Sequence, residues 1–273
     1  MNMQLQHKVI LVLSLVLGLL IIVVNGAGLL FPDVLYARET TNWYAQSVGQ
    51  DIADLFFALP VLVISSLLAY RQDKKALLVW AGTLVYLIYT FLIYCFAIHF
   101  NQLFVLYCII LGLSVYLFLW FILTQYGEPV NSWFRKEIPV RLFGFFMIAI
   151  GILFYTLWLM PVIPAIISNT TPRELTDAGL FTNPVHVLDL SVCLPGIIIT
   201  GILLLKRHPV GLLMTPVVLT FFVIMDISLA TLMVVMRSKG VASNPVVMIF
   251  MFALTILSLA MLIIYLRSMK KEI

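Results

Sequence analysis

The sequence is poor in charged residues. Aspartate, glutamate, lysine and arginine make up 10% of its 273 residues, whereas hydrophobic residues make up 63%. A soluble domain of this length would have to expose a largely apolar surface, so the composition excludes that class. The mean hydropathy of +1.13 instead indicates a chain that lies in a lipid bilayer.

Cysteine is also scarce, and known catalytic motifs are absent. The three cysteines, Cys95, Cys108 and Cys193, form no CxxC pair, which argues against a thiol–disulfide relay. The sequence contains no nucleotide-binding glycine loop, nucleophile elbow or HExxH motif, and no soluble head that would belong to a kinase or ATPase. We therefore assign no catalytic residue and no cofactor.

Long apolar runs are abundant. A bilayer core about 30 Å thick needs about 20 apolar residues per helix, and backbone groups in lipid must be satisfied within the segment. The fold class predicted is an all-α transmembrane bundle with eight helices. The runs cover residues 9–31, 52–70, 76–98, 103–124, 142–166, 187–205, 210–235 and 246–266.

The first run is the one that a signal peptidase could remove. NGAG at 25–28 resembles a cleavage site, but the apolar stretch continues through Phe31, so we expect a retained spanning helix.

Basic residues predict the orientation through the positive-inside bias. With the amino terminus in the cytoplasm, twelve Lys and Arg residues fall inside and four, Arg38, Arg173, Arg237 and Lys239, fall outside. Both termini are therefore predicted to be cytoplasmic. This distribution also accounts for the net charge of +4, so we expect the lipid bilayer, and no nucleic acid, as partner. The sequence does not decide between a protein partner and a homo-oligomer.

The outer loops differ from the inner turns. Residues 32–50 and 168–185 are long and polar, whereas the inner turns at 71–75 and 206–209 are short. Their aromatic residues suit a membrane interface, and long loops also often carry function.

An internal duplication is predicted by an offset of 135 residues. Asp54 falls on Asp189, and Pro60 falls on Pro195, within a shared D-L-x-x-x-L-P pattern. Aspartate and proline are rare in spanning helices, so the coincidence is informative. We predict parallel four-helix repeats over 1–127 and 140–273, joined by a cytoplasmic linker over 128–139.

Three segments carry a resemblance to a known family. QDIADLFFALP, IYCFAIHFNQLFVLY and HVLDLSVCLPGIIITGILLLKRHPVG resemble segments of an uncharacterised family of bacterial polytopic membrane proteins. The resemblance implies a location in the bacterial cytoplasmic membrane. It implies no activity.

Polar residues inside the apolar runs are the candidate site. An ionisable side chain at a helix centre costs about 2.5–3.5 kcal/mol on insertion scales, and such residues usually face a bundle interior. Most candidates are predicted near the outer end of their helices. The proposed ion- or substrate-binding residues are Asp51, Asp54, Tyr94, His99, Asn101, His186, Asp189 and Asp226.

The spacing of the polar residues supports the predicted site but leaves alternatives open. Asp51/Asp54 and His186/Asp189 are i,i+3 pairs on one helix face, and Tyr86, Thr90 and Tyr94 form a polar line at i,i+4,i+8. The i,i+3 pairs could instead cap helix starts, where a carboxylate is favoured. His99, His186, Asp189 and Asp226 could surround a metal ion, but H-x-x-D spacing is common and we assign none.

Three functions fit these observations. The first is a carrier for a small solute or ion with a polar site in the outer half of the bundle. The second is a non-enzymatic accessory or sensor protein that acts through its outer loops. The third is an intramembrane enzyme that uses aspartate and histidine.

Overall fold

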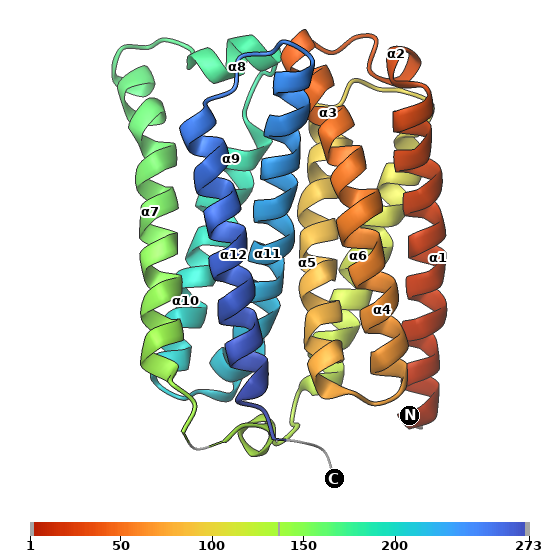
Figure 1. Ribbon diagram of the computed structural model, residues 1–273, viewed down its shortest axis with the longest axis vertical. Coiled ribbons are helices and arrows are strands. Elements are labelled where there is room, and N and C mark those ends of the chain that lie inside the picture. Colours follow the sequence, from red (N-terminus) through yellow and green to blue (C-terminus); the bar gives the residue numbers. More distant parts are fainter. Residues whose placement is uncertain (1–2, 136, 271–273) are drawn as a thin grey trace. The chain divides into compact units, whose positions relative to one another are not determined.

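Eight membrane-spanning helices dominate the computed structural model, which describes residues 3–135 and 137–270 (Figure 1). Length and composition make this an integral, multi-pass membrane protein. The spanning segments are α1 (Met3–Leu30), α3 (Thr41–Ala53) with η1 (Asp54–Ala58) and α4 (Leu59–Tyr70), α5 (Lys74–Ala97), α6 (Phe104–Gln125), α7 (Val140–Ile167), α9 (Pro184–Leu188) with η3 (Asp189–Cys193) and α10 (Leu194–Leu205), α11 (Pro209–Ser238) and α12 (Pro245–Arg267).

The connections contain short helices. These are α2 (Pro32–Leu35), the 3₁₀ helix η2 (Val130–Trp133) and α8 (Arg173–Ala178). Residues 32–50 and 168–185 are thus partly helical, in contrast to the polar loops predicted. Lys136 and Lys271, two of the residues counted for the orientation, lie outside the described residues.

The chain forms two compact units. The first comprises Met1–Glu128 with Pro216–Arg267, and the second comprises Pro129–Thr215 with Ser268–Ile273. The boundary between the units therefore differs from the predicted repeat boundary, because most of α11 and all of α12 belong to the first unit. The two repeats remain a prediction.

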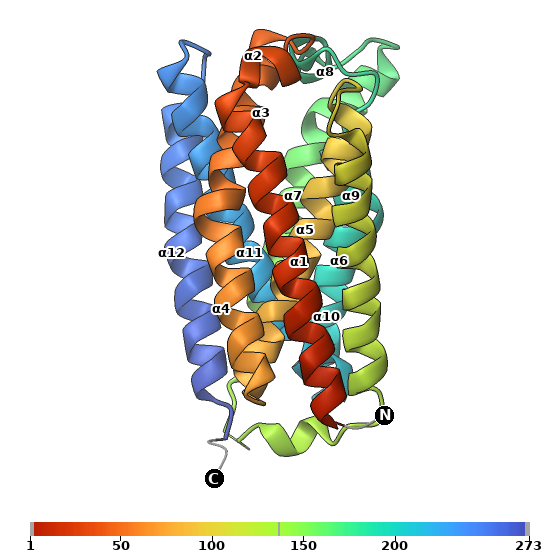
Figure 2. The ribbon, with the colours of Figure 1, turned by 90° about the vertical axis from the view of Figure 1, so that its right-hand side faces the viewer.

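In the first unit, α5 is the most buried spanning helix. It contacts α4 and α6, and α1 contacts α3, α4 and α6 (Figure 2). Helix α11 approaches α3 and α5 closely at two glycines. A Cβ at Gly49 would lie 2.7 Å from Leu232 Cα, and one at Gly82 would lie 2.6 Å from the carbonyl oxygen of Val217. Close approach of backbones stabilises helix pairs in lipid through van der Waals contact.

In the second unit, α7 packs along α10 (Figure 1). A Cβ at Gly144 would lie 2.6 Å from Leu205, and one at Gly151 would lie 2.6 Å from Ile198. On the α10 side, Gly201 faces the carbonyl oxygen of Gly144. Small residues therefore set the distance between these two helices.

A one-turn π-helix interrupts one spanning segment in each unit. η1 begins at Asp54 and η3 begins at Asp189, 135 residues later, and each is five residues long. The helices that follow, α4 and α10, both begin with Leu-Pro and both have 12 residues. π-helical turns inside α-helices are rare and are frequently found at functional sites.

The second spanning segment begins earlier than predicted. α3 begins at Thr41, where the Thr40 side chain caps the helix by accepting from the Trp43 amide, instead of near residue 52. Asp51 and Asp54 consequently lie near the middle of a 30-residue segment. The interpretation of these two acids as helix caps, and their placement at a helix end, are wrong.

Candidate functional site

Two carboxylates of the first unit are completely buried. Asp51 and Asp54 each have an exposed fraction of 0%. They are three residues apart across the junction of α3 and η1, so they project from one side of the segment. Their hydrogen-bond partners come from α1, α3, α5 and the segment after α2.

Asp54 accepts hydrogen bonds from three neutral side chains. Tyr86 Oη of α5 donates to Asp54 Oδ1 at 2.7 Å, and Gln50 Nε2 donates to the same oxygen at 2.9 Å. Asn25 Nδ2 of α1 donates to Asp54 Oδ2 at 3.3 Å. Because a typical N–H···O distance is about 2.9 Å, Oδ2 is the less well satisfied oxygen.

Asp51, Asp54 and their hydrogen-bond partners form what we call the acid cluster, which extends to α11 through Ser228. Tyr86 Oη lies 3.0 Å from Ser228 Oγ, and Ser228 Oγ donates to Gln50 Oε1 at 3.2 Å. Gln50 Nε2 lies 2.7 Å from Tyr86 Oη. Asp54 is therefore joined by hydrogen bonds to α1, α5 and α11.

Asp51 is held by two tyrosines. Tyr94 Oη of α5 donates to Oδ1 at 2.7 Å, and Tyr36 Oη donates to Oδ2 at 2.8 Å. Tyr36 precedes the spanning segment, and burial raises its pKa well above the ordinary value, with the nearby Asp51 carboxylate raising the pKa further. The Tyr36 phenol thus remains protonated and donates.

No described cation balances these two acids. The hydrogen-bond partners of Asp51 and Asp54 in the described residues are all neutral, and neither acid takes part in an ion pair there. Taking an ionised carboxylate out of water costs several kcal/mol. The side-chain oxygen Asn25 Oδ1, on a fully buried residue beside Asp54, has no hydrogen-bond partner among the residues that the structure describes. Buried oxygens without a partner are rare in proteins, and a bound water or ion is one way in which they are satisfied.

Asp226 belongs to a different part of the same unit. It is 6% exposed on α11, and Ser258 Oγ of α12 donates to its Oδ2 at 2.9 Å. This hydrogen bond joins α11 to α12. No hydrogen bond in the described residues joins it to Asp51 or Asp54.

His99 and Asn101 lie at the connection of α5 to α6. His99 Nδ1 is 3.0 Å from Glu39 Oε2, and the His99 amide donates to Glu39 Oε1 at 2.7 Å, so His99 ties this connection to the segment before α3. Asn101 Nδ2 lies 3.2 Å from Tyr107 Oη, and the Tyr107 ring contacts Tyr94 at 5.1 Å between centroids. Asn101 therefore borders the cluster, whereas His99 is half exposed and separate from it.

His186 and Asp189 lie in the second unit beside Trp158 of α7. Trp158 Nε1 donates to Asp189 Oδ2 at 2.7 Å, and the Trp158 and His186 rings lie 4.8 Å apart between centroids. His186 is in the first turn of α9, where the capping interpretation was placed, but Asp189 starts η3 one turn later. Both are partly exposed in this unit.

The four residues considered for a metal ion are divided between the two units: His99 and Asp226 belong to the first, and His186 and Asp189 belong to the second. Within residues 3–135 and 137–270, no group of three or more His, Cys, Asp or Glu side chains is arranged to hold a metal ion. His99 is paired with Glu39, and Asp226 is paired with Ser258.

Comparison with models of known protein families, with curated proteins and with solved structures found no match. No family is assigned.

Sequence reasoning identified the acids and the tyrosine line of α5 but missed several partners. Tyr86 and Tyr94 were predicted only to form a polar line along one helix, and the structure shows that Tyr86 donates to Asp54 and Tyr94 to Asp51. Asn25 and Ser228 were missed, because each is a single polar residue in an apolar run. Gln50, one residue before Asp51, was assigned to a loop that is helical.

Proposed function

We propose that this membrane protein is a carrier for a small solute or ion, and that Asp51 and Asp54 bind a proton or a monovalent cation. The observation that carries the proposal is the complete burial of both carboxylates among neutral partners. Two adjacent ionised carboxylates without a counterion would be strongly destabilising in this interior. The cluster therefore holds at least one proton or cation when the helices are packed. Intramembrane acids of this kind mark ion pathways and proton relays.

The Asn25 amide can form a hydrogen bond with Asp54 in both the ionised and the protonated state of the carboxyl group. Its Nδ2 donates to Asp54 Oδ2 when the carboxylate is ionised. A half-turn of the amide would place Asn25 Oδ1 there instead, where it accepts a hydrogen bond from a protonated carboxyl. Alternatively, Asn25 Oδ1 and Asp54 Oδ2 offer two oxygen ligands to a cation, which prefers such atoms.

The π-helix η1 supports movement at this site. Leu59 donates its amide to the carbonyl of Asp54, five residues earlier, and Pro60 has no amide hydrogen to donate. The turn after Asp54 therefore lacks regular α-helical bonds, which lowers the free energy needed to change its geometry.

We propose further that the chain consists of two parallel four-helix repeats, 1–127 and 140–273. Support comes from η1 and η3, which begin at equivalent aspartates 135 residues apart and precede helices of equal length. Repeats of this orientation occur in secondary transporters. The proposed location is the bacterial cytoplasmic membrane, with both termini inside.

The test compares proton and cation binding in wild type, Asp54→Asn and the control Asp177→Asn. Asp177 is exposed on α8 of the second unit, so the control makes the same chemical change in water. Purified protein in lipid nanodiscs is melted from acidic to alkaline pH in sodium, potassium, lithium or choline chloride. Infrared spectra then record the carboxylic acid C=O band.

We expect wild type and Asp177→Asn to show a pH- or cation-dependent melting temperature that Asp54→Asn lacks. If a proton is the ligand, Asp54→Asn also loses a carboxylic acid band. Cation-dependent uptake into proteoliposomes, absent in Asp54→Asn, then tests the carrier. Identical responses from wild type and Asp54→Asn would overturn the proposal and would favour the accessory role of the outer loops.

A further inference from the structure

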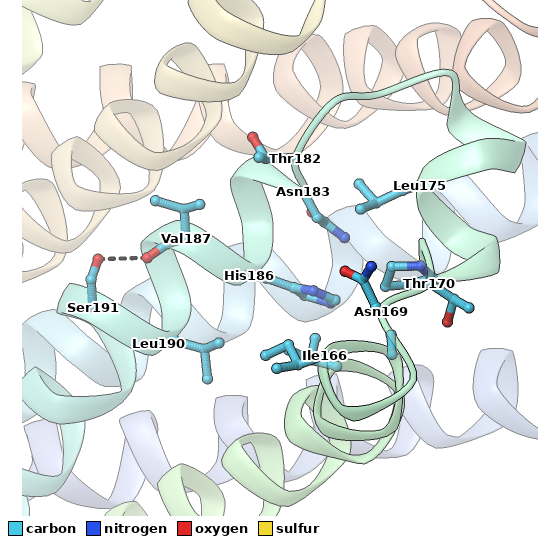
Figure 3. A pocket seen from close by; sticks show the side chains of 13 residues that line it. Ile166, Asn169, Thr170, Leu175, Thr182, Asn183, His186, Val187, Leu190 and Ser191 are labelled. Carbon is cyan, nitrogen blue, oxygen red and sulfur yellow. Dashed lines mark hydrogen bonds between the residues drawn. The ribbon is translucent and has the colours of Figure 1, made fainter.

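A cavity of about 720 Å³ lies within the second unit, apart from the acid cluster. It is bounded by the end of α7, the segment through α8 and the start of α9 with η3 (Figure 3). Binding sites for small organic molecules typically measure about 300–1,000 Å³ and have mostly apolar walls with a few polar groups. The volume and the mostly apolar lining fit that description, and the cavity is widely open to its surroundings. Its apolar wall includes Val162, Ile166, Leu175 and Leu190.

Three polar side chains point toward the same space in the cavity. Figure 3 shows Asn169, Asn183 and His186 converging there from the end of α7, the connecting segment and α9. Asn183 Oδ1 accepts from the Val185 amide at 3.0 Å, which leaves its Nδ2 group to donate into the cavity. The side chains of Asn169 and His186 have no hydrogen-bond partner within the described residues.

The walls define the ligand. The lining residues in the described part of the chain include no Lys, Arg, Asp or Glu. A charged ligand would therefore meet no side chain of opposite full charge in the lining. Amide N–H groups and an imidazole N–H donate to carbonyl or carboxylate oxygens. Trp158 packs against the His186 ring, which fixes the orientation of that donor.

We infer that this cavity binds a small organic molecule with an apolar body and a carbonyl or carboxylate head. The head lies among Asn169, Asn183 and His186, and the body lies against the aliphatic wall. The inference depends on the second unit alone and holds whether or not Asp54 binds a cation. If the protein is a carrier, this molecule is the solute class to assay first.

The test uses octanoate and octanamide as probes. Acetate, which has a carboxylate head but no apolar body, serves for comparison. Equilibrium binding of each radiolabelled probe is measured in nanodiscs, with empty nanodiscs subtracted. The variants are Asn169→Ala/His186→Ala, which removes two head contacts, and Leu175→Trp, which fills the cavity. Asn131→Ala, an exposed asparagine of η2, is the matched control. Melting temperatures identify any variant that fails to fold.

We expect at least one eight-carbon probe to bind wild type and Asn131→Ala, with acetate binding much more weakly. Loss of two hydrogen bonds should weaken binding by about tenfold or more, as should filling the cavity. Absence of binding to wild type, or equal binding to the folded cavity variants, would overturn the inference. Binding of octanoate alone selects a carboxylate head, and binding of octanamide as well admits a neutral one.

Mass spectrometry of the extracted protein distinguishes two sources of this chemistry. An acyl lipid that copurifies with wild type and is displaced by octanoate assigns the cavity to a bilayer component. Octanoate binding to protein without such a lipid assigns it to a water-borne carboxylate. In both cases, the bound molecule contacts the same residues of the cavity.

Discussion

Gly28 of α1 illustrates how tightly the acid cluster is packed. A Cβ at this position would overlap the Asp51 carboxylate and would lie 2.8 Å from Tyr36 Oη. Tyr36 and Tyr94 hold that carboxylate from both sides, so it cannot move away without losing a hydrogen bond. A residue without a side chain is therefore needed at residue 28.

Gly28→Ala should destabilise the protein, whereas Gly26→Ala should not. A Cβ at Gly26 meets nothing within 4 Å, and both residues lie in α1, so the gain in helix propensity is the same. Overpacking by one methyl group typically costs about 1–3 kcal/mol. The check is thermal melting of both variants in the same detergent. Equal melting temperatures would mean that the cluster yields to the added methyl group.

The residue scale also explains which partners the sequence disclosed. The common face of Tyr86 and Tyr94 was predictable, because eight residues of helix return a side chain to nearly the same face, but their contact with the acids was not. Asn25 is 29 residues from Asp54 and Ser228 is 142 residues from Tyr86. Pairings over such separations depend on how helices pack, which a single polar residue in an apolar run does not specify.

At the scale of elements, α5 and α6 form a hairpin whose connected ends are held by aromatic contacts. Tyr94 of α5 and Tyr107 of α6 contact each other, and the neighbouring cysteines, Cys95 and Cys108, place their Sγ atoms 4.0 Å apart. All three cysteines are free. The proximity of Cys95 to Cys108 was not apparent from the sequence, because their spacing matches no known cysteine motif.

Mild oxidation with copper phenanthroline should therefore join Cys95 to Cys108 within one chain and leave Cys193 as a thiol. The two Sγ atoms lie 4.0 Å apart, and a disulfide requires them to approach to about 2.05 Å. Maleimide labelling of the denatured protein, read by mass spectrometry, should fall from three labels to one, and to none in Cys193→Ala. Retention of three labels after oxidation would contradict the packing of α5 on α6.

At the scale of the whole molecule, an even number of candidate spans predicts that both termini lie on the same side of the membrane. Which side that is remains a prediction from the basic residues. The acid cluster and the organic-ligand cavity belong to different compact units, so variants of the two sites should not share a phenotype unless transport couples them.

The orientation can be checked with single cysteines in a variant lacking the three native ones. Asp177→Cys on α8 should react with a membrane-impermeant maleimide in intact cells, because the segment over 168–185 is predicted to be outside. Asn131→Cys on η2 should react only after the cells are broken, because the linker over 128–139 is predicted to be inside. The reverse pattern would invert the topology.

The sequence by itself determined the eight spanning helices, because each one must satisfy its backbone hydrogen bonds within its own residues in lipid. It also located Asp51 and Asp54, because aspartate is rare in an apolar run. Only the tertiary structure decided that their segment begins at Thr41, that a π-helix starts at Asp54 and that neutral side chains from α1, α5 and α11 surround the acids. These features depend on contacts between distant segments, which local hydropathy does not encode.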